Sequence, residues 1–208
     1  MRTRIGAAAL AGAAVLASST GAAPPAAATA TTWTVRPGGA ITATAGTTTL
    51  TDTTTGSTFL CASSSMTGTL NSGGGLPGTG IGSITAAAYR SCANPISPTL
   101  MPRGLPWHLN LVSYDAATGV SEGTISHLRL SFSAPRCGAV INGTSGSTTG
   151  GMVRITYANP AGKLKILPAG GTLHWYHVSG CAGLVRNGDH ATLSAAYALS
   201  PPQTITSP

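Results

Sequence analysis

One short motif in the sequence has the spacing of a hydrolase nucleophile. Gly119-Val120-Ser121-Glu122-Gly123 matches GxSxG, which in hydrolases exposes a serine on a sharp turn from a strand into a helix. That chemistry also requires a histidine and an acid beside the serine. The flanking residues here favour a loop before the motif and a strand after it. We therefore interpret the motif as part of a hairpin turn and predict no catalytic residue from it.

The densest cluster of chemically versatile side chains is His174-Trp175-Tyr176-His177. On a strand, His174 and Tyr176 share one face, and Trp175 and His177 share the other. The two histidines therefore cannot bind one metal ion together without a bulge. We expect one face to be packed and the other exposed, so one of Trp175 and Tyr176 is buried. Trp107, Trp175 and Tyr176 are the candidate binding residues, because an exposed ring could stack on a sugar or another planar ligand.

Acid–base chemistry would have to use the four acidic residues of the chain, Asp52, Asp115, Glu122 and Asp189. They fall in separate predicted loops and turns, and nothing in the sequence places any two of them together as a glycosidase requires. Asn187-Gly188-Asp189 is typical of a turn before the last long strand. We therefore expect a non-catalytic protein. The alternatives are a hydrolase of an extracellular polymer and a carrier of a small apolar ligand.

Four cysteines, an even number, predict two disulfides in an exported chain: Cys61, Cys92, Cys137 and Cys181. No CxxC pair occurs, so we expect no zinc site, and we expect no other metal or cofactor. Three connectivities are possible. We favour Cys61 with Cys92 and Cys137 with Cys181, because each pair would then bracket one group of strands.

The first 30 residues have the pattern of a cleaved secretory signal peptide. Arg2 and Arg4 precede a small apolar run over residues 5–17, and small-x-small sites end at Ala28 and Ala30. That run is shorter than the about 20 residues that a membrane span needs. We predict a signal peptide over 1–30 and one secreted domain over 31–208, with two lobes, 31–103 and 104–208, as an alternative.

Charge and composition restrict the classes of partner that the protein could bind. The 208 residues include 11 Lys and Arg but only 4 Asp and Glu, and 7% of residues are charged. The basic residues are scattered and no aromatic residues lie among them, so we expect no specific nucleic-acid binding. Weak attraction to an anionic cell-wall polymer, or binding to a carbohydrate, is the expectation. No later segment is long and apolar enough to predict a transmembrane helix.

Short runs rich in Thr, Val, Ile, Tyr and Trp, separated by Gly, Pro, Asn and Ser, predict about a dozen strands and no helix. Apolar residues alternate in 128–132 and 153–157, and Asn159–Gly162 predicts a hairpin between strands 152–157 and 163–167. The Thr-rich segment 41–58 has little to bury, so we expect an edge strand pair or a loosely ordered arm. The fold class is all-β, an antiparallel β-sandwich with a β-barrel as the alternative.

Four stretches carry a resemblance to known proteins: Gly104–Asn110, Tyr114–Gly119, Ser179–Leu184 and Asn187–Asp189. Together with the Ala-, Gly- and Thr-rich start, they resemble a group of uncharacterised secreted proteins of actinomycetes. The resemblance implies an extracellular β-protein and transfers no catalytic residue. The sequence thus predicts a secreted surface or binding module.

Overall fold

The computed structural model describes residues 31–144 and 149–208, so the predicted signal peptide lies outside the described residues. The strands are β1 (Thr32–Arg36), β2 (Gly39–Ala45), β3 (Thr48–Asp52), β4 (Thr58–Leu70), β5 (Gly73–Pro77), β6 (Gly82–Ala93), β7 (Thr99–Arg103), β8 (Trp107–Asp115), β9 (Val120–Ala134), β10 (Cys137–Asn142), β11 (Gly151–Ala158), β12 (Lys163–Leu167), β13 (Leu173–Ser179), β14 (His190–Ser200) and β15 (Thr204–Thr206), with a short 3₁₀ helix, η1 (Asn159–Ala161), between β11 and β12.

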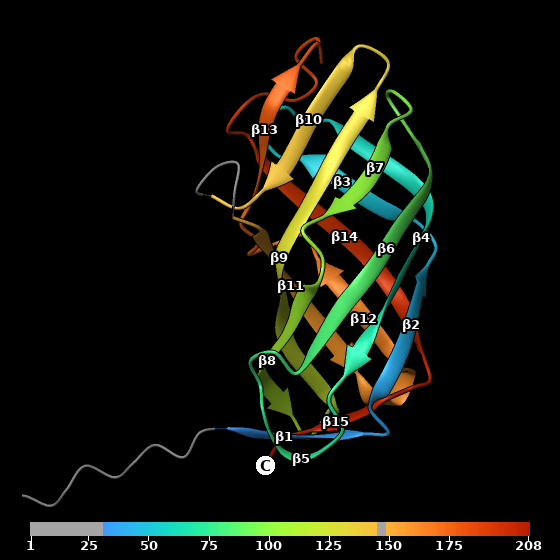
Figure 1. The fold of residues 1–208 in the computed structure, drawn as a ribbon, viewed down its shortest axis with the longest axis vertical. Coiled ribbons are helices and arrows are strands. Elements are labelled where there is room, and N and C mark those ends of the chain that lie inside the picture. The colour runs from blue at the N-terminus through green and yellow to red at the C-terminus, as the bar shows by residue number, and fades with distance from the viewer. Residues whose placement is uncertain (1–30, 145–148) are drawn as a thin grey trace, which may run out of the picture.

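The larger sheet closes on itself (Figure 1). Strands β2, β4, β6, β8, β9, β11, β12 and β14 pair antiparallel in this order, and β14 then pairs with β2. The prediction of an all-β antiparallel fold is confirmed. The sequence left two arrangements open, an antiparallel β-sandwich and a β-barrel. The pairing of β14 with β2 closes this sheet, as in a barrel.

Short strands follow one another along the long strands. β2 pairs with β4 from Gly39 to Ala45, and β3 continues along β4 from Thr48 to Thr51. Both also pair with β14 on their other side. The expectation of an edge pair or a loose arm over 41–58 is therefore wrong. The segment does have side chains to bury: Ile41, Ala43, Ala45 and Leu50 belong to a core shared with the opposite strands, and Thr48 and Asp52 are buried as well.

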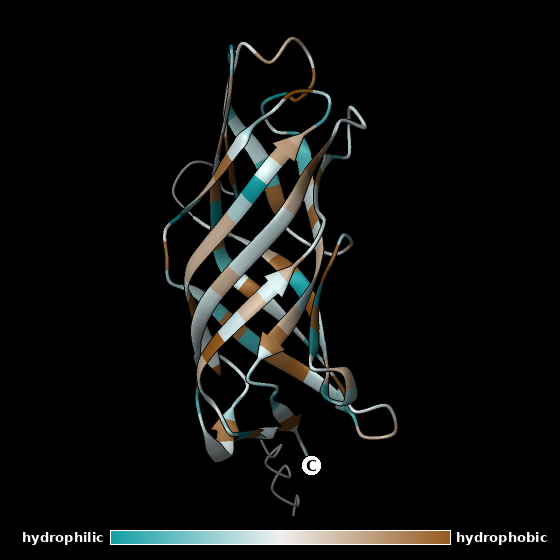
Figure 2. Ribbon diagram, turned by 90° about the vertical axis from the view of Figure 1, so that its right-hand side faces the viewer, coloured by the Kyte–Doolittle hydropathy of each residue, from teal (hydrophilic) through white to brown (hydrophobic). Residues whose placement is uncertain are grey.

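Apolar and polar residues alternate along many strands (Figure 2), and the apolar ones are buried, so the core lies inside the closed sheet. Leu128, Leu130 and Phe132 are buried, as the sequence predicts, while Arg129 is only half-buried. The predicted hairpin at Asn159–Gly162 is confirmed by the β11–β12 pairing. One continuous core runs from Trp33 to Ile205 and takes residues from both predicted lobes.

A three-stranded sheet of β15, β1 and β5 crosses one end of the closed sheet (Figure 1). Gln203 ties this end to the core: its backbone N–H donates to the Tyr157 hydroxyl at 3.0 Å, and that hydroxyl donates to its carbonyl at 2.8 Å. The Gln203 side chain accepts the N–H of Gly38 at 2.8 Å. These buried groups are therefore satisfied where the chain enters and leaves the fold.

Both predicted disulfides are present. Cys61 on β4 pairs with Cys92 on β6, and Cys137 on β10 pairs with Cys181 in the loop that follows β13. The first joins two neighbouring strands, and the second anchors the loop of residues 180–189 to the rim of the sheet. In the described part of the chain, no helix has the length and apolar character to cross a membrane.

Candidate functional site

The second half of β8 carries the most exposed large apolar side chain among the described residues. Val112 is 68% exposed. It lies in a bulge, because Leu111 pairs with Gly123 and Ser113 pairs with Glu122, which leaves Val112 without a partner on β9. A bulge of this kind redirects a side chain and is common beside functional sites. We call β8 residues 111–115 and their neighbours the β8 site.

The larger of two surface hollows at the β8 site has a volume of about 460 Å³. Leu111, Val112 and Trp33 contribute apolar lining, and Thr79 contributes a hydroxyl. Gly78 closes one wall, where its carbonyl accepts the N–H of Leu111 at 2.9 Å. A Cβ at Gly78 would collide with the Leu111 carbonyl and the Trp33 indole, so only glycine fits this close approach.

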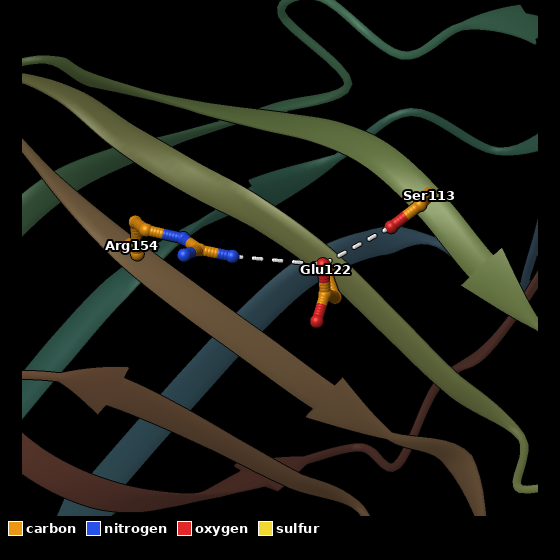
Figure 3. A network of polar contacts seen from close by, with 3 residues as sticks. All are labelled: Ser113, Glu122 and Arg154. Carbon is orange, nitrogen blue, oxygen red and sulfur yellow. Dashed lines mark hydrogen bonds and ion pairs between the residues drawn. The ribbon is translucent and has the colours of Figure 1, made fainter. Parts of the chain in front are cut away.

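The second hollow, of about 310 Å³, is lined mainly by polar residues and lies against the same strand. Ser113, Tyr114, Asp115 and Glu122 line it. Figure 3 shows that the Ser113 hydroxyl donates to Glu122 Oε2 at 3.3 Å, and that Arg154 on β11 approaches the same oxygen at 3.6 Å. Glu122 and Arg154 are about half exposed, so their pairing adds little stability and leaves both groups open to a ligand.

Asp115 has a structural task in this hollow. Its Oδ1 accepts the N–H of Ala117 at 2.9 Å, and its Oδ2 accepts the hydroxyl of Thr118 at 2.7 Å. These hydrogen bonds, that of the Thr118 hydroxyl first, lower the pKa of Asp115 below its ordinary value. Both carboxylate oxygens are therefore used to close the turn between β8 and β9.

The three predicted binding aromatics do not form a surface together. Trp107 and Trp175 are fully buried, because both occupy inward positions of their strands. Their faces are therefore packed in the core and cannot stack on a ligand. Tyr176 is half-buried, and its hydroxyl donates to the carbonyl of Thr144 at 3.0 Å. The expectation that one of Trp175 and Tyr176 is buried is confirmed, and the buried one is Trp175.

The histidines form two edge-on pairs. The ring centroids of His174 and His190 are 5.1 Å apart, and those of His108 and His127 are 4.8 Å apart. His177 does not share the inward face with Trp175 as alternation predicts, because its φ of 52° turns it outward. Within residues 31–144 and 149–208, no three His, Cys, Asp or Glu side chains gather where a metal ion could be held.

The GxSxG serine cannot act as a nucleophile in this structure. Ser121 is fully buried on β9, and its hydroxyl has no hydrogen-bond partner. Gly119 lies in the predicted hairpin turn, but the strand already begins at Val120, so the motif is mostly strand. No side chain capable of activating Ser121 is hydrogen-bonded to it.

The fold brings acidic residues nearer to one another than the sequence indicates. Asp115 and Glu122 line the same hollow, and Asp52 lies near enough to Asp189 for the charge of Asp189 to help raise its pKa. Neither arrangement can be read from the sequence, since each involves residues of different elements. The expected turn before β14 is present, where Asp189 N–H donates to the carbonyl of Arg186 at 3.2 Å.

Two cavities enclosed by core residues of the described part of the chain are too small for a carried ligand. Their volumes are about 20 and 10 Å³, whereas ligand pockets measure about 300–1,000 Å³. The hollows of the β8 site fall in that range. They were missed from sequence, although one signal was available: Val112 follows Leu111 and puts an apolar residue at an outward position.

Comparisons with protein-family models, with curated proteins and with solved structures find no match to this chain. The β8 site therefore has to be interpreted from its own geometry.

Proposed function

We propose that this protein is a non-catalytic extracellular binding module and that its β8 site takes a carbohydrate chain. The observation that carries the proposal is the Val112 bulge, which sets an exposed apolar side chain between residues of two hollows, one lined by Trp33 and Leu111 and the other by Asp115 and Glu122. A sugar ring has an apolar face and a rim of hydroxyls that both donate and accept. The site has groups that match each of these features.

The polar groups match the hydroxyl rim. Glu122 accepts hydrogen bonds, Arg154 donates several in a planar fork, and Ser113 does both. Ser113 and Arg154 contact Glu122 Oε2 at 3.3 and 3.6 Å. These two contacts involve only one oxygen of Glu122 and one nitrogen of Arg154, so the three side chains can still make hydrogen bonds to a ligand. Tyr114, which is half-buried, adds part of an aromatic ring at a low cost in conformational entropy.

Charge favours a neutral sugar at this site over an anionic polymer. Two carboxylates, Asp115 and Glu122, line the second hollow, and only Glu122 is paired with a guanidinium, that of Arg154, so an anionic chain would be repelled. The expected weak attraction to an anionic cell-wall polymer would have to come from basic residues elsewhere. The extracellular location is supported by the two disulfides, which persist in oxidising compartments.

Retention of the protein on insoluble polysaccharides tests the proposal. Cellulose, chitin and purified cell wall are incubated with wild type and with Arg154→Ala, which should weaken retention about tenfold or more, because a hydrogen bond to a charged group is lost. Lys165→Ala is the matched control. Lys165 lies exposed on β12, next to β11, and does not line the site. Its replacement therefore removes the same charge without changing the site.

Equal weakening by both variants would contradict a specific site, as would retention on none of the three polysaccharides. A salt series separates the two sources of attraction. Binding through the basic surface fades as the Debye length falls from about 8 Å to about 3 Å at 1 M salt, whereas binding at the β8 site persists.

A further inference from the structure

Asp52 ends β3 in a fully buried position, and one of its carboxylate oxygens has no partner. Its Oδ1 accepts the N–H groups of Thr54 and Thr55, both at 2.9 Å. Its Oδ2 is buried without a hydrogen bond, and the Oδ2 of Asp189 is in the same state. A buried carboxylate oxygen without a donor is costly, so these two atoms require an explanation.

The backbone holds these two carboxyl groups side by side. Asp52 lies opposite Ala191 in the β3–β14 ladder, and Thr53 N–H donates to the carbonyl of His190 at 2.9 Å. Asp189 directly precedes His190, so its carboxyl group comes close enough to Asp52 for its charge to help raise the pKa of that residue. Two ionised carboxylates that lie close together repel each other, but one shared proton can bridge them in a hydrogen bond.

This contact joins the turn between β3 and β4 to the loop of residues 180–189. The Thr55 hydroxyl donates to the carbonyl of Leu184 at 2.6 Å, and Val185 of the loop is buried. The disulfide at Cys181 fixes one end of the loop, and β14 fixes the other. Between these anchors, the Asp52–Asp189 contact adds to what holds the loop against the sheet.

The surrounding elements contribute three further charged or titratable side chains. His190 opens β14, and its ring contacts the Thr53 hydroxyl at 3.4 Å and the carbonyl of Gly171 at 3.2 Å. His174 on β13 packs edge-on against His190, and Arg186 is an exposed residue of the loop itself. Apart from Asp52, β3 and β4 contain no charged residue.

We propose that Asp52 and Asp189 share one proton and form a pH-sensitive latch that holds residues 180–189 against the β3–β4 turn. A shared proton needs only the two unpartnered oxygens that the structure provides. Ca²⁺ takes six to eight oxygen ligands, and no third acid or histidine gathers here among the described residues.

The direction of the switch follows from the surroundings of Asp52. Burial, followed by the charge and hydrogen bond of Asp189, raises the pKa of Asp52 above its ordinary value, against the opposing effect of the two turn N–H groups. The latch is therefore closed in acid, where the proton is present. The latch loosens as the pH rises and the proton shared by the two carboxyl groups is lost.

Hydrogen–deuterium exchange of the backbone amides of residues 180–189, corrected for the intrinsic pH dependence of exchange, tests the latch between pH 4 and pH 8. In the wild type, protection should fall about tenfold across this range, because the hydrogen bond made by the shared proton is lost. In Asp52→Asn the amide can donate to Asp189 permanently, so protection should stay high and independent of pH.

Asp189→Asn is the second variant, in case Asp52→Asn does not fold, and it should give the same constant protection. Asp115→Asn is the matched control and should keep the wild-type pH dependence. Protection that does not change with pH in the wild type overturns the latch, as does a wild-type pH response in both asparagine variants. Added Ca²⁺ that restores protection at pH 8 in the wild type alone would also overturn it, in favour of a metal site.

Discussion

Two hairpin turns of this protein have the same sequence pattern and nearly the same hydrogen bonds, yet their aspartates differ in pKa. Residues 52–56 and 115–119 both have the pattern D-x-x-T-G. In each turn the glycine has a positive φ, 77° or 68°, and its N–H donates to the carbonyl of the aspartate, at 2.9 or 2.8 Å. The pKa of Asp52 is raised, whereas that of Asp115 is lowered.

The difference comes from what packs on each turn. The second turn faces solvent, so the Thr118 hydroxyl folds back onto its own aspartate. The first turn is covered by the loop of residues 180–189, and the Thr55 hydroxyl donates to Leu184 of that loop. Asp52 is left beside Asp189 in a buried site. The turn itself is therefore a property of the local sequence, and the protonation of its aspartate is a property of the tertiary contact.

Removing the disulfide that anchors the covering loop should have the largest effect. The double variant Cys137→Ala/Cys181→Ala should lose about 4 kcal/mol of unfolding free energy, by the chain-entropy relation for a separation of 44 residues. Cys61→Ala/Cys92→Ala should lose nearly as much, because its separation is 31 residues. Urea unfolding at pH 4 and pH 8 measures both.

Only the Cys137–Cys181 variant should also change how stability depends on pH through Asp52, because it frees the loop that carries Asp189. If both double variants alter the pH dependence alike, the covering loop is not what distinguishes the two turns.

Asp52→Asn and Asp115→Asn should shift the stability of the fold in opposite directions. A raised pKa stabilises the fold at low pH, and this contribution is lost as the pH rises through the folded-state pKa. Asparagine does not ionise, so Asp52→Asn should have a higher melting temperature than the wild type at pH 8 and the same one at pH 4. A lowered pKa stabilises above the ordinary value and is lost as the pH falls, so Asp115→Asn should melt below the wild type at pH 8. Thermal unfolding followed by circular dichroism checks both, and a shift of the same sign in the two variants would refute the comparison.

The sequence could predict what local pattern controls. Alternation in residues 128–132 predicts which side chains are buried, and the positions of the cysteines relative to the strands predict both disulfides. The Thr-rich segment 41–58 differs from the prediction because its burial depends on β14 and β4 lying on either side of it. Local pattern carries little information on such long-range pairing.

The candidate site was predicted less well for the same reason. Trp107 and Trp175 were selected for their chemistry, but inward positions on β8 and β13 bury them. Arg154 reaches Glu122 only because β11 pairs with β9. The Asp52–Asp189 contact likewise requires the loop of residues 180–189 to fold over the first turn, which no motif in either segment indicates.

Replacing the threonine of each D-x-x-T-G turn by valine should have the smallest effect on stability, and it compares the two turns through a single hydroxyl group. Valine keeps the branched shape of threonine and removes only the hydroxyl. Thr55→Val should cost about 1 kcal/mol, because the partly buried Leu184 carbonyl loses its donor. Thr118→Val should barely change stability, since this turn is exposed, but it should raise the pKa of Asp115 towards its ordinary value, because the Thr118 hydroxyl is the main cause of the lowering. Carboxyl-carbon NMR titration of Asp115 in the two variants measures this shift. An unchanged Asp115 pKa in Thr118→Val, or an equal shift in Thr55→Val, would mean that the turn hydroxyls do not set the difference between the two aspartates.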